Sequence, residues 1–269
     1  MWAFEVSDVY KKITVLRQNA ELALTHKERV VAPVIPARDA SVLEFKAHPL
    51  KKGLSSKEGQ ARMLHDLASI ELQAMELGLR TLAEFPDAPE EFKTDLWKIT
   101  VSESEHLEMC LQEIAALGFK WGDWPVNCGL WQTVSAEDSL IDRVLIVHRY
   151  LEGSGLDAGD TLLKRLGGVD ATGVKKAVKI INTEEIGHVL FGTEWYIRLC
   201  KGEGLNPGED FNLRMDRLRS VLPKRINPIN TELRIQAGFS QEEISYLNRL
   251  RDSFLDKDSV WKKNLQFSK

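Results

Sequence analysis

Two Glu-x-x-His motifs carry the clearest chemical signal in this sequence. Glu103 and His106 form the first motif, and Glu185 and His188 form the second. A spacing of three residues puts the two side chains of each pair on one face of an α-helix, where both can bind the same metal ion. Carboxylate and imidazole groups together suit divalent ions such as iron or manganese. The motifs therefore predict a metal site in a helical fold.

Each motif follows a further glutamate at a matched interval, which indicates a twofold repeat of one helical hairpin. Glu71 precedes Glu103 by 32 residues, and Glu152 precedes Glu185 by 33 residues. All four glutamates fall within apolar stripes at helical spacing, so we expect four helices to direct carboxylates toward one core. Buried carboxylates need positive charge, which two divalent cations supply. The predicted metal ligands are Glu71, Glu103, His106, Glu152, Glu185 and His188.

Two neighbouring residues leave alternatives for this ligand set. Glu184 could replace Glu185, because it also lies close to His188 in helical register, although the repeat favours Glu185. His148 lies four residues before Glu152 on the same face. It could be a seventh ligand, a hydrogen-bond donor behind the site, or a packed core histidine.

The helix that carries Glu152 is rich in glycine and has an aromatic neighbour. Gly153, Gly155 and Gly159 indicate either a local bulge with open space or close packing against another helix. Tyr150 could be a redox-active neighbour of the site, but an aromatic residue on an apolar stripe more often belongs to the core.

Four long helices are expected to position the ligands. Capping residues, prolines and glycines indicate where each helix begins and ends. The expected helices run from the capping box Ser55–Glu58 to Pro86, from Asp87 and Pro89 to Gly118, from Ser135 to Gly167, and from Asp170 to Gly202.

The connections between these helices predict their topology. The first two helices, and likewise the last two, are joined by only a few residues, so each pair should be an antiparallel hairpin. Residues 119–134 between the pairs form a tryptophan-rich loop. Sixteen extended residues reach about 50 Å, whereas a helix of 25 residues is about 37 Å long. We therefore expect a four-helix bundle with one long crossover.

The two ends of the chain are predicted to pack against this bundle. A helix is expected at residues 8–25 and an irregular strap with three prolines at 27–55. Two further helices are expected at residues 211–222 and 240–255. The sequence thus predicts one all-α domain over residues 1–269. Its parts are an N-terminal helix and strap (1–54), a metal-binding bundle (55–202) and a C-terminal helical appendage (203–269).

Composition narrows the class of protein. The 269 residues are 43% hydrophobic and carry 36 basic against 40 acidic side chains, a net charge of −4. This balance gives no electrostatic drive toward nucleic acid. No run of apolar residues is long enough for a transmembrane helix, and we expect a cytoplasmic protein without a membrane role. Three scattered cysteines predict packed thiols rather than disulfides.

The chain resembles the ferritin-like di-iron carboxylate superfamily, in which two helices each supply a glutamate and two supply Glu-x-x-His. More narrowly, the segments His65–Leu82, Tyr150–Gly153 and Asn230–Phe239 resemble the DUF455 family of uncharacterised ferritin-like bacterial proteins. This resemblance spans most of the chain. It implies a ferritin-like fold and the same six ligands, and it leaves the reaction open.

The first functional hypothesis is an oxidoreductase in which two iron ions, or alternatively manganese, activate dioxygen to oxidise or hydroxylate a small-molecule substrate. Large additions to a minimal bundle of about 150 residues could build its pocket. An external electron donor is implied, because the sequence has no flavin or nicotinamide fingerprint. A ferroxidase or storage protein is the alternative, and a structural protein with a vestigial site is the third. A homodimer and a modified tRNA substrate, the latter suggested by resemblance to tRNA-modifying di-iron hydroxylases, stay open.

Overall fold

The computed structural model describes the backbone of residues 1–266 and the side chains of residues 1–255. Within those limits the chain forms helices, turns and an isolated bridge between Val42 and Val126, with no strand. The prediction of an all-α fold is therefore confirmed. No helix in this part of the chain has the length and apolar character needed to cross a lipid bilayer.

The chain divides into two compact units. Unit 1 consists of Met1–Arg143 and Arg165–Ile181. Unit 2 consists of Val144–Lys164 and the chain from Asn182 onward. The expected single domain, with internal boundaries near residues 54 and 202, stays a prediction.

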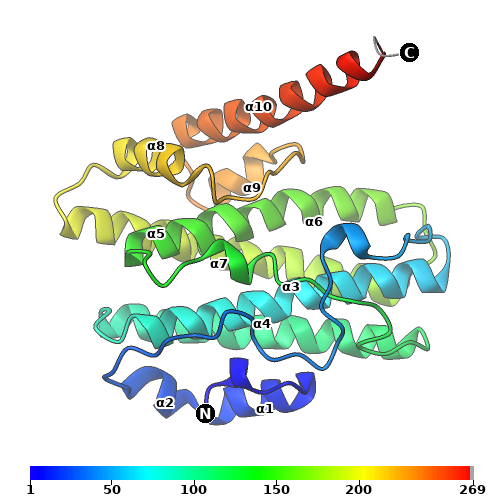
Figure 1. The fold of residues 1–269 in the computed structure, drawn as a ribbon, viewed down its shortest axis with the longest axis horizontal. Helices are drawn as coiled ribbons and strands as arrows, with labels where there is room; N and C mark the ends of the chain where they lie inside the picture. The colour runs from blue at the N-terminus through cyan, green and yellow to red at the C-terminus, as the bar shows by residue number, and fades with distance from the viewer. Residues whose placement is uncertain (267–269) are drawn as a thin grey trace. The chain divides into compact units, whose positions relative to one another are not determined.

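A helical hairpin forms the centre of unit 1. Its two members, α3 (Lys57–Glu84) and α4 (Glu90–Ala116), lie side by side (Figure 1). Only five residues join them, so they run antiparallel. The hydroxyl of Ser56 caps α3 by accepting a hydrogen bond from the Gly59 amide. The capping box predicted at Ser55 is therefore wrong by one residue, because Ser56 has the extended backbone of a cap.

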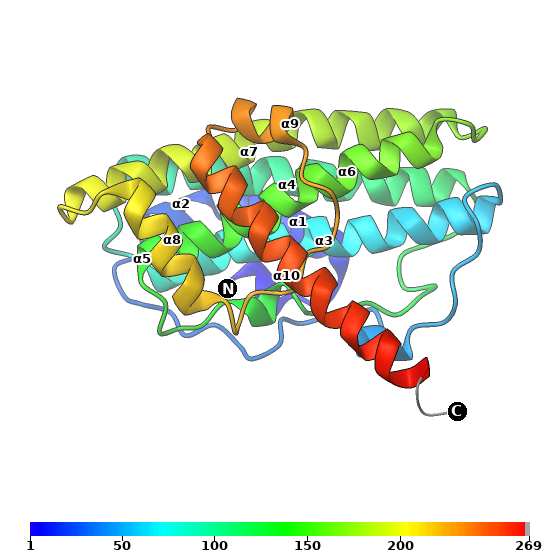
Figure 2. The same cartoon turned by 90° about the horizontal axis from the view of Figure 1, so that it is seen from above.

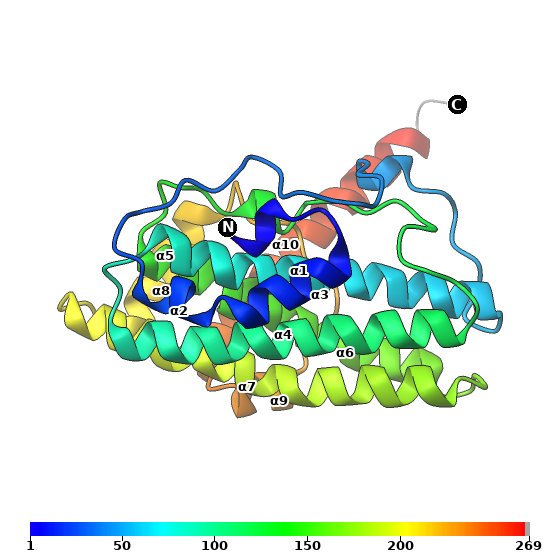
Figure 3. The same ribbon diagram turned by 90° about the horizontal axis from the view of Figure 1, so that it is seen from below.

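Two short helices cover one side of this hairpin (Figure 3). They are α1 (Val9–Gln18), which Asp8 caps, and α2 (Ala20–Thr25). The single helix predicted over residues 8–25 is thus broken at Asn19. The backbone of Asn19 leaves the helical region, and its side-chain amide donates a hydrogen bond to the Met1 carbonyl.

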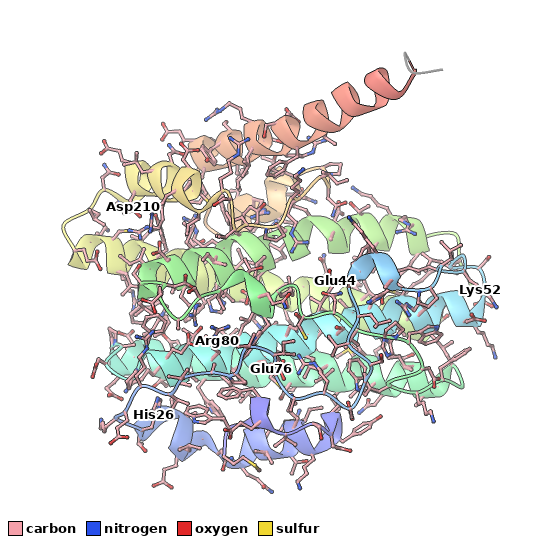
Figure 4. All side chains as sticks on the ribbon, in the orientation of Figure 1. His26, Glu44, Lys52, Glu76, Arg80 and Asp210 are labelled. Carbon is pink, nitrogen blue, oxygen red and sulfur yellow. The ribbon has the colours of Figure 1, made fainter. Side chains whose placement is uncertain are left out.

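A buried ion cluster holds the N-terminal strap against α3. Glu76 of α3, labelled in Figure 4, is fully buried. It forms ion pairs with Lys12 from α1 and with Arg38 from the strap. Arg38 Nη1 lies 2.6 Å from Glu76 Oε1. Apart from the short turn η2 (Phe45–Ala47), the strap is irregular. A second short turn, η1 (Ala3–Glu5), precedes α1.

The loop after α4 follows α3 over much of its length. The Gly122 amide donates to His65 Nε2 at 3.1 Å, and the Leu130 amide donates to Gln73 Oε1 at 3.0 Å. Further along, Arg80 donates to the carbonyl of Trp131 in the turn η3 (Trp131–Thr133). The loop therefore passes from the N-terminal half of α3 to its C-terminal half.

The third long helix begins later than predicted. Its first segment, α5 (Leu140–Val144), follows Ser139, whose hydroxyl accepts from the Asp142 amide at 3.2 Å and donates to the Asp142 carboxylate at 2.9 Å. Ser135, the predicted cap, instead belongs to a preceding turn in which its amide donates to Asp138 at 2.8 Å. The prediction of a helix from Ser135 is therefore wrong.

A π-helix interrupts the same helix. It spans Leu145–Leu151 (η4) and leads into α6 (Glu152–Leu166). All seven residues of η4 are buried, including His148 and Arg149. The last long helix, α7 (Thr172–Gly202), ends at the predicted glycine.

Three helices make up the C-terminal part of unit 2: α8 (Pro207–Leu218), α9 (Thr231–Gln236) and α10 (Gln241–Gln266). Figure 2 shows α8, α9 and the first half of α10 grouped together. The sequence did not predict α9, and α8 starts four residues before the predicted Phe211, because Asn206 caps it. The capping box Ser240–Glu243 is confirmed by hydrogen bonds in both directions.

One buried ion pair links η4 to α10. The Arg149 guanidinium makes a bidentate bond to Glu243, with distances of 2.9 and 3.0 Å. Its plane also lies over the rings of Tyr196, Phe211 and Phe239, at 4.9, 4.9 and 4.4 Å from their centroids. Cation–π contacts and the carboxylate together solvate this buried cation.

Glu243→Ala should destabilise the protein by about 3–5 kcal/mol, because it leaves the Arg149 charge buried without its counter-ion. The neighbouring Glu242 is exposed, so Glu242→Ala should change the free energy of unfolding by less than about 0.5 kcal/mol. Urea denaturation of both variants and the wild type measures the difference. Equal stabilities for the two variants would contradict the role given to the ion pair.

His65 should make the stability of the fold depend on pH. Burial, helped by the charge of Arg62, lowers the pKa of His65 to about 4. The Nε2 atom must also stay unprotonated to accept from Gly122. The unfolded chain, with a pKa near 6.5, therefore binds more protons than the folded chain between these values. Stability is complete above about pH 6.5 and falls as the pH falls toward 4, by up to about 3 kcal/mol.

This dependence can be isolated with His65→Gln, which keeps a hydrogen-bond acceptor and removes the titrating ring. The free energy of unfolding of both proteins is measured between pH 4 and 7. It should change with pH in the same way in both proteins only above pH 6.5. If the wild type and the variant lost stability in parallel over that range, His65 would not be the titrating group.

Candidate metal centre

All six predicted ligands are buried. Their exposed fractions are 9% or less: Glu71 3%, Glu103 1%, His106 0%, Glu152 9%, Glu185 9% and His188 4%. In contrast, Glu184 is exposed, so the register of α7 favours Glu185 as the inward carboxylate. Glu105, next to the first motif, is also exposed.

Unit 1 contributes the first half-site, which we define as Glu71, Glu103 and His106. Glu71 comes from α3, and the other two come from α4. His106 Nδ1 lies 3.6 Å from Glu71 Oε2 and 3.6 Å from Glu103 Oε2. The imidazole nitrogen thus stands between carboxylate oxygens of both helices, so three potential metal-binding groups converge on one point.

Close packing of α3 against α4 makes this convergence possible. A Cβ atom on Gly78 would lie 2.3 Å from Thr100 Oγ1, so only glycine fits at this crossing. One turn beyond His106, Cys110 is fully buried. Burial and then the Glu71 carboxylate raise the pKa of the Cys110 thiol. Burial thus favours the neutral thiol at this position.

Unit 2 contributes the second half-site, which we define as Glu152, Glu185 and His188. Glu152 is the first residue of α6, directly after the π-helix. A π-helical turn widens the backbone spacing and re-aims the side chains that follow it, and such turns occur frequently at functional sites. Glu185 Oε1 lies 3.3 Å from His188 Nδ1, so the second motif forms a compact pair on α7.

The antiparallel register of α7 against η4 and α6 brings these residues to the same level. A Cβ atom on Gly192 would lie 2.4 Å from Cβ of His148, and one on Gly159 would lie 2.1 Å from Oδ1 of Asn182. Between these two contacts, Glu152 falls opposite His188. The second half-site is therefore also assembled from two adjoining helices.

His148 supports Glu152. Its Nδ1 atom lies 2.8 Å from Glu152 Oε1, and both groups are buried. The rings of Phe191 and His148 form a T-shaped pair, with centroids 5.0 Å apart. Among the alternatives left by the sequence, this contact favours a residue that orients Glu152 from behind.

The glycines after Glu152 serve mainly close packing. A Cβ atom on Gly153 would collide with Arg234 Nη1 at 2.1 Å, and Gly159 contacts Asn182, whereas Gly155 has open space around it. The local bulge expected in this region is present, but it lies before Glu152, in η4. Tyr150 donates its hydroxyl to the Pro223 carbonyl at 2.7 Å, an ordinary structural bond.

The donor sets fit divalent cations. Each half-site has two carboxylates and one imidazole, so its formal charge of −2 with ionised acids matches one divalent ion. Two atoms that each bind one ion at about 2.1 Å are about 3.0–3.6 Å apart for bond angles of 90–120°. The contacts around His106 and between Glu185 and His188 fall in or near this range. Oxygen-rich sites with one imidazole suit iron and manganese.

Two features of this region were not predicted in full. The glycines after Glu152 indicated a bulge as one alternative, but they did not place it before Glu152, where the π-helix lies. Gly192 was not singled out. Its spacing of four residues after His188 was the signal that could have identified it as the point of closest approach.

Comparisons with known proteins identify the family of this chain, but they do not indicate a reaction. A family described as "Protein of unknown function (DUF455)" matches residues 5–245. A protein of Haemophilus influenzae, described as uncharacterised, is 34% identical over 205 residues, which cover 73% of this chain and 70% of that protein. No solved structure matches the chain.

Gly192→Ala should destabilise the protein by about 1–3 kcal/mol, because the added methyl group must push α7 away from His148. Gly187 lies on the same helix with no atom within 4 Å of its missing Cβ. Gly187→Ala should therefore be neutral or stabilise by up to about 1 kcal/mol through helix propensity. Thermal and urea unfolding test the pair. A neutral Gly192→Ala would contradict the close approach.

Proposed function

The chain belongs to the DUF455 family, and we propose that its two half-sites together hold two metal ions in a ferritin-like bundle. We further propose that the protein is a di-iron carboxylate oxidoreductase that uses dioxygen to oxidise or hydroxylate a small molecule. One observation carries this proposal: a buried glutamate beside a buried Glu-x-x-His pair occurs in both units. The order of the helices, with the long loop between the two hairpins, supports the ferritin-like assignment.

Each residue has a definite task in this proposal. The imidazoles of His106 and His188 would each bind one ion, and the four carboxylates would balance the ionic charge. His148 would orient Glu152 through their hydrogen bond. Leu72, Met75 and Leu107 are fully buried and close to the ligands in sequence, and they would help to keep water from the site. Two ferrous ions bound there would supply the electrons with which dioxygen is reduced.

The electrons for repeated turnover would come from a partner protein, because the sequence has no fingerprint for a flavin or nicotinamide cofactor. Manganese is the second metal that this donor set accepts. The large segments outside the four long helices support catalysis on an organic substrate over storage. A storage protein needs surfaces that assemble into a shell, and such additions would obstruct them.

Metal analysis tests the site. Protein produced in iron-supplemented medium should contain about two ions per chain, one for each half-site. The double variant Glu103→Ala/His106→Ala should lose stoichiometric binding, because it removes two of the three groups of the first half-site. Glu105→Ala removes an exposed carboxylate between them and should keep both ions. Retention of two ions by the double variant would refute the ligand assignment.

The reaction needs a separate test. The iron-loaded protein, reduced without oxygen and then mixed with dioxygen, should consume about one dioxygen for two irons and show a transient absorption change. Native mass should correspond to a small oligomer. Many irons per chain in a large hollow assembly would replace the proposed activity with storage.

A further inference from the structure

One part of the N-terminal strap in unit 1 exposes large apolar side chains to solvent. We define this part, residues 43–53, as the strap tip. Phe45 is 66% exposed and Leu50 is fully exposed. Single exposed apolar residues are common, but here two large ones lie within six residues of each other. The proposed metal centre does not account for their exposure. The same stretch carries three exposed lysines: Lys46, Lys51 and Lys52.

Polar contacts fix the strap tip to the first turns of α3. Arg62 of α3 is buried, and its Nη2 atom lies 3.0 Å from Nδ1 of His48. Lys51 Nζ lies 2.6 Å from Asp66 Oδ2 and 5.6 Å from the centroid of the Phe45 ring. The strap tip is therefore held by its polar side chains, while its large apolar side chains stay in solvent.

This end of unit 1 has a surplus of positive charge. Gln60 Nε2 of α3 donates to the Asp170 carbonyl at 3.3 Å, so the beginning of α7 lies beside the beginning of α3 (Figures 2 and 3). Residues 44–66, 113–123 and 165–181 meet at this end and carry ten basic against six acidic side chains. The whole chain has a net charge of −4. Positive charge is therefore concentrated here.

Local ion pairs leave this surplus in place. Lys52, labelled in Figure 4, pairs with Glu58, and Asp66 is shared by Lys51 and Arg62. The acids of these pairs are already included in the count of six, so the surplus of basic side chains remains. Three further lysines of this end are exposed: Lys46, Lys57 and Lys176.

Exposed apolar groups beside lysines match the chemistry of a membrane surface. Binding to such a surface grows with the apolar area that leaves water and with the attraction of basic residues to anionic lipids. We propose that the strap tip binds reversibly to a membrane that contains anionic lipids. Phe45 and Leu50 enter the interfacial layer, and the neighbouring lysines contact lipid phosphates.

The local surface explains why this proposal differs from the expectation of no membrane role. That expectation rested on the net charge and on the lack of a spanning segment, and both describe the chain as a whole. Nucleic acid would also match the positive charge, but it gives no reason for a fully exposed leucine at Leu50. Membrane binding accounts for both the charge and the apolar side chains, and it does not depend on the metal centre.

Sedimentation of the full-length protein with lipid vesicles tests the proposal. Vesicles of phosphatidylcholine alone are compared with vesicles that contain about 40% phosphatidylglycerol, which is anionic. The protein should bind the anionic vesicles at least about tenfold more tightly. Binding should weaken when the salt concentration rises from about 0.05 M to about 0.5 M, because salt screens the charges. No binding to the anionic vesicles, or equal binding to both kinds, would overturn the proposal.

Apolar variants separate a membrane from other polyanions. Phe45→Ser/Leu50→Ser should weaken binding to anionic vesicles at least about tenfold, because two apolar side chains no longer leave water. Both positions are exposed, so the unfolding temperature should stay the same. The matched control is Leu213→Ser, which changes a 72% exposed leucine of α8 in unit 2 and should bind as the wild type does. Salt-sensitive binding that the double variant keeps in full would indicate a general polyanion surface, such as one for RNA, and refute membrane insertion.

Lysine variants test where the electrostatic attraction acts. Lys46→Gln and Lys57→Gln should each weaken binding to anionic vesicles about fivefold, the effect expected for one lysine near the lipid surface. Lys201→Gln removes the same charge from an exposed position in the last turn of α7 and should leave binding unchanged. Equal weakening by all three variants would show a non-local charge effect and contradict the assigned surface.

Discussion

Ionised carboxylates buried in a helical protein need positive charge close by. This requirement explains how segments outside the long helices are attached to them. Glu76 attracts Lys12 and Arg38, and Asp157 attracts Arg234. Each of these pairs ties a peripheral segment to a long helix. Buried pairs of this kind add little net stability, but removing one partner strongly destabilises the fold. They therefore act mainly by specifying which segment packs where.

Histidines lie beside the acids of the half-sites. His106 is close to Glu71 and Glu103, and His148 bonds to Glu152. A neutral imidazole brings no positive charge, and a histidine is charged only part of the time near neutral pH. In the proposed centre, divalent ions would supply the positive charge that these buried acids need.

Local signals predicted some of this structure, and tertiary contacts determined the rest. Pro86 and Gly118 mark helix ends because their own backbone chemistry limits a helix. The start of the third helix was mispredicted because the sequence offers two successive caps, at Ser135 and Ser139, and both form hydrogen bonds. Spacing and apolar periodicity correctly placed all six ligand candidates in the buried interior. The position of the π-helix before Glu152 and the partner of Arg149, 94 residues away, have no local signature, whereas the cap of α9 at Asn230 was overlooked.

The two hairpins are similar in ligand spacing but not in structure, and this difference matters for the proposed centre. Glu71 sits in the middle of a regular α-helix, whereas Glu152 directly follows a π-helix and gives Oε1 to His148. A carboxylate with one oxygen hydrogen-bonded has less freedom to change how it binds a metal ion. In the proposed centre, the hydrogen bond from His148 would therefore restrict how Glu152 binds its ion, so the π-helix and His148 together would fix this ligand more firmly than helix register alone.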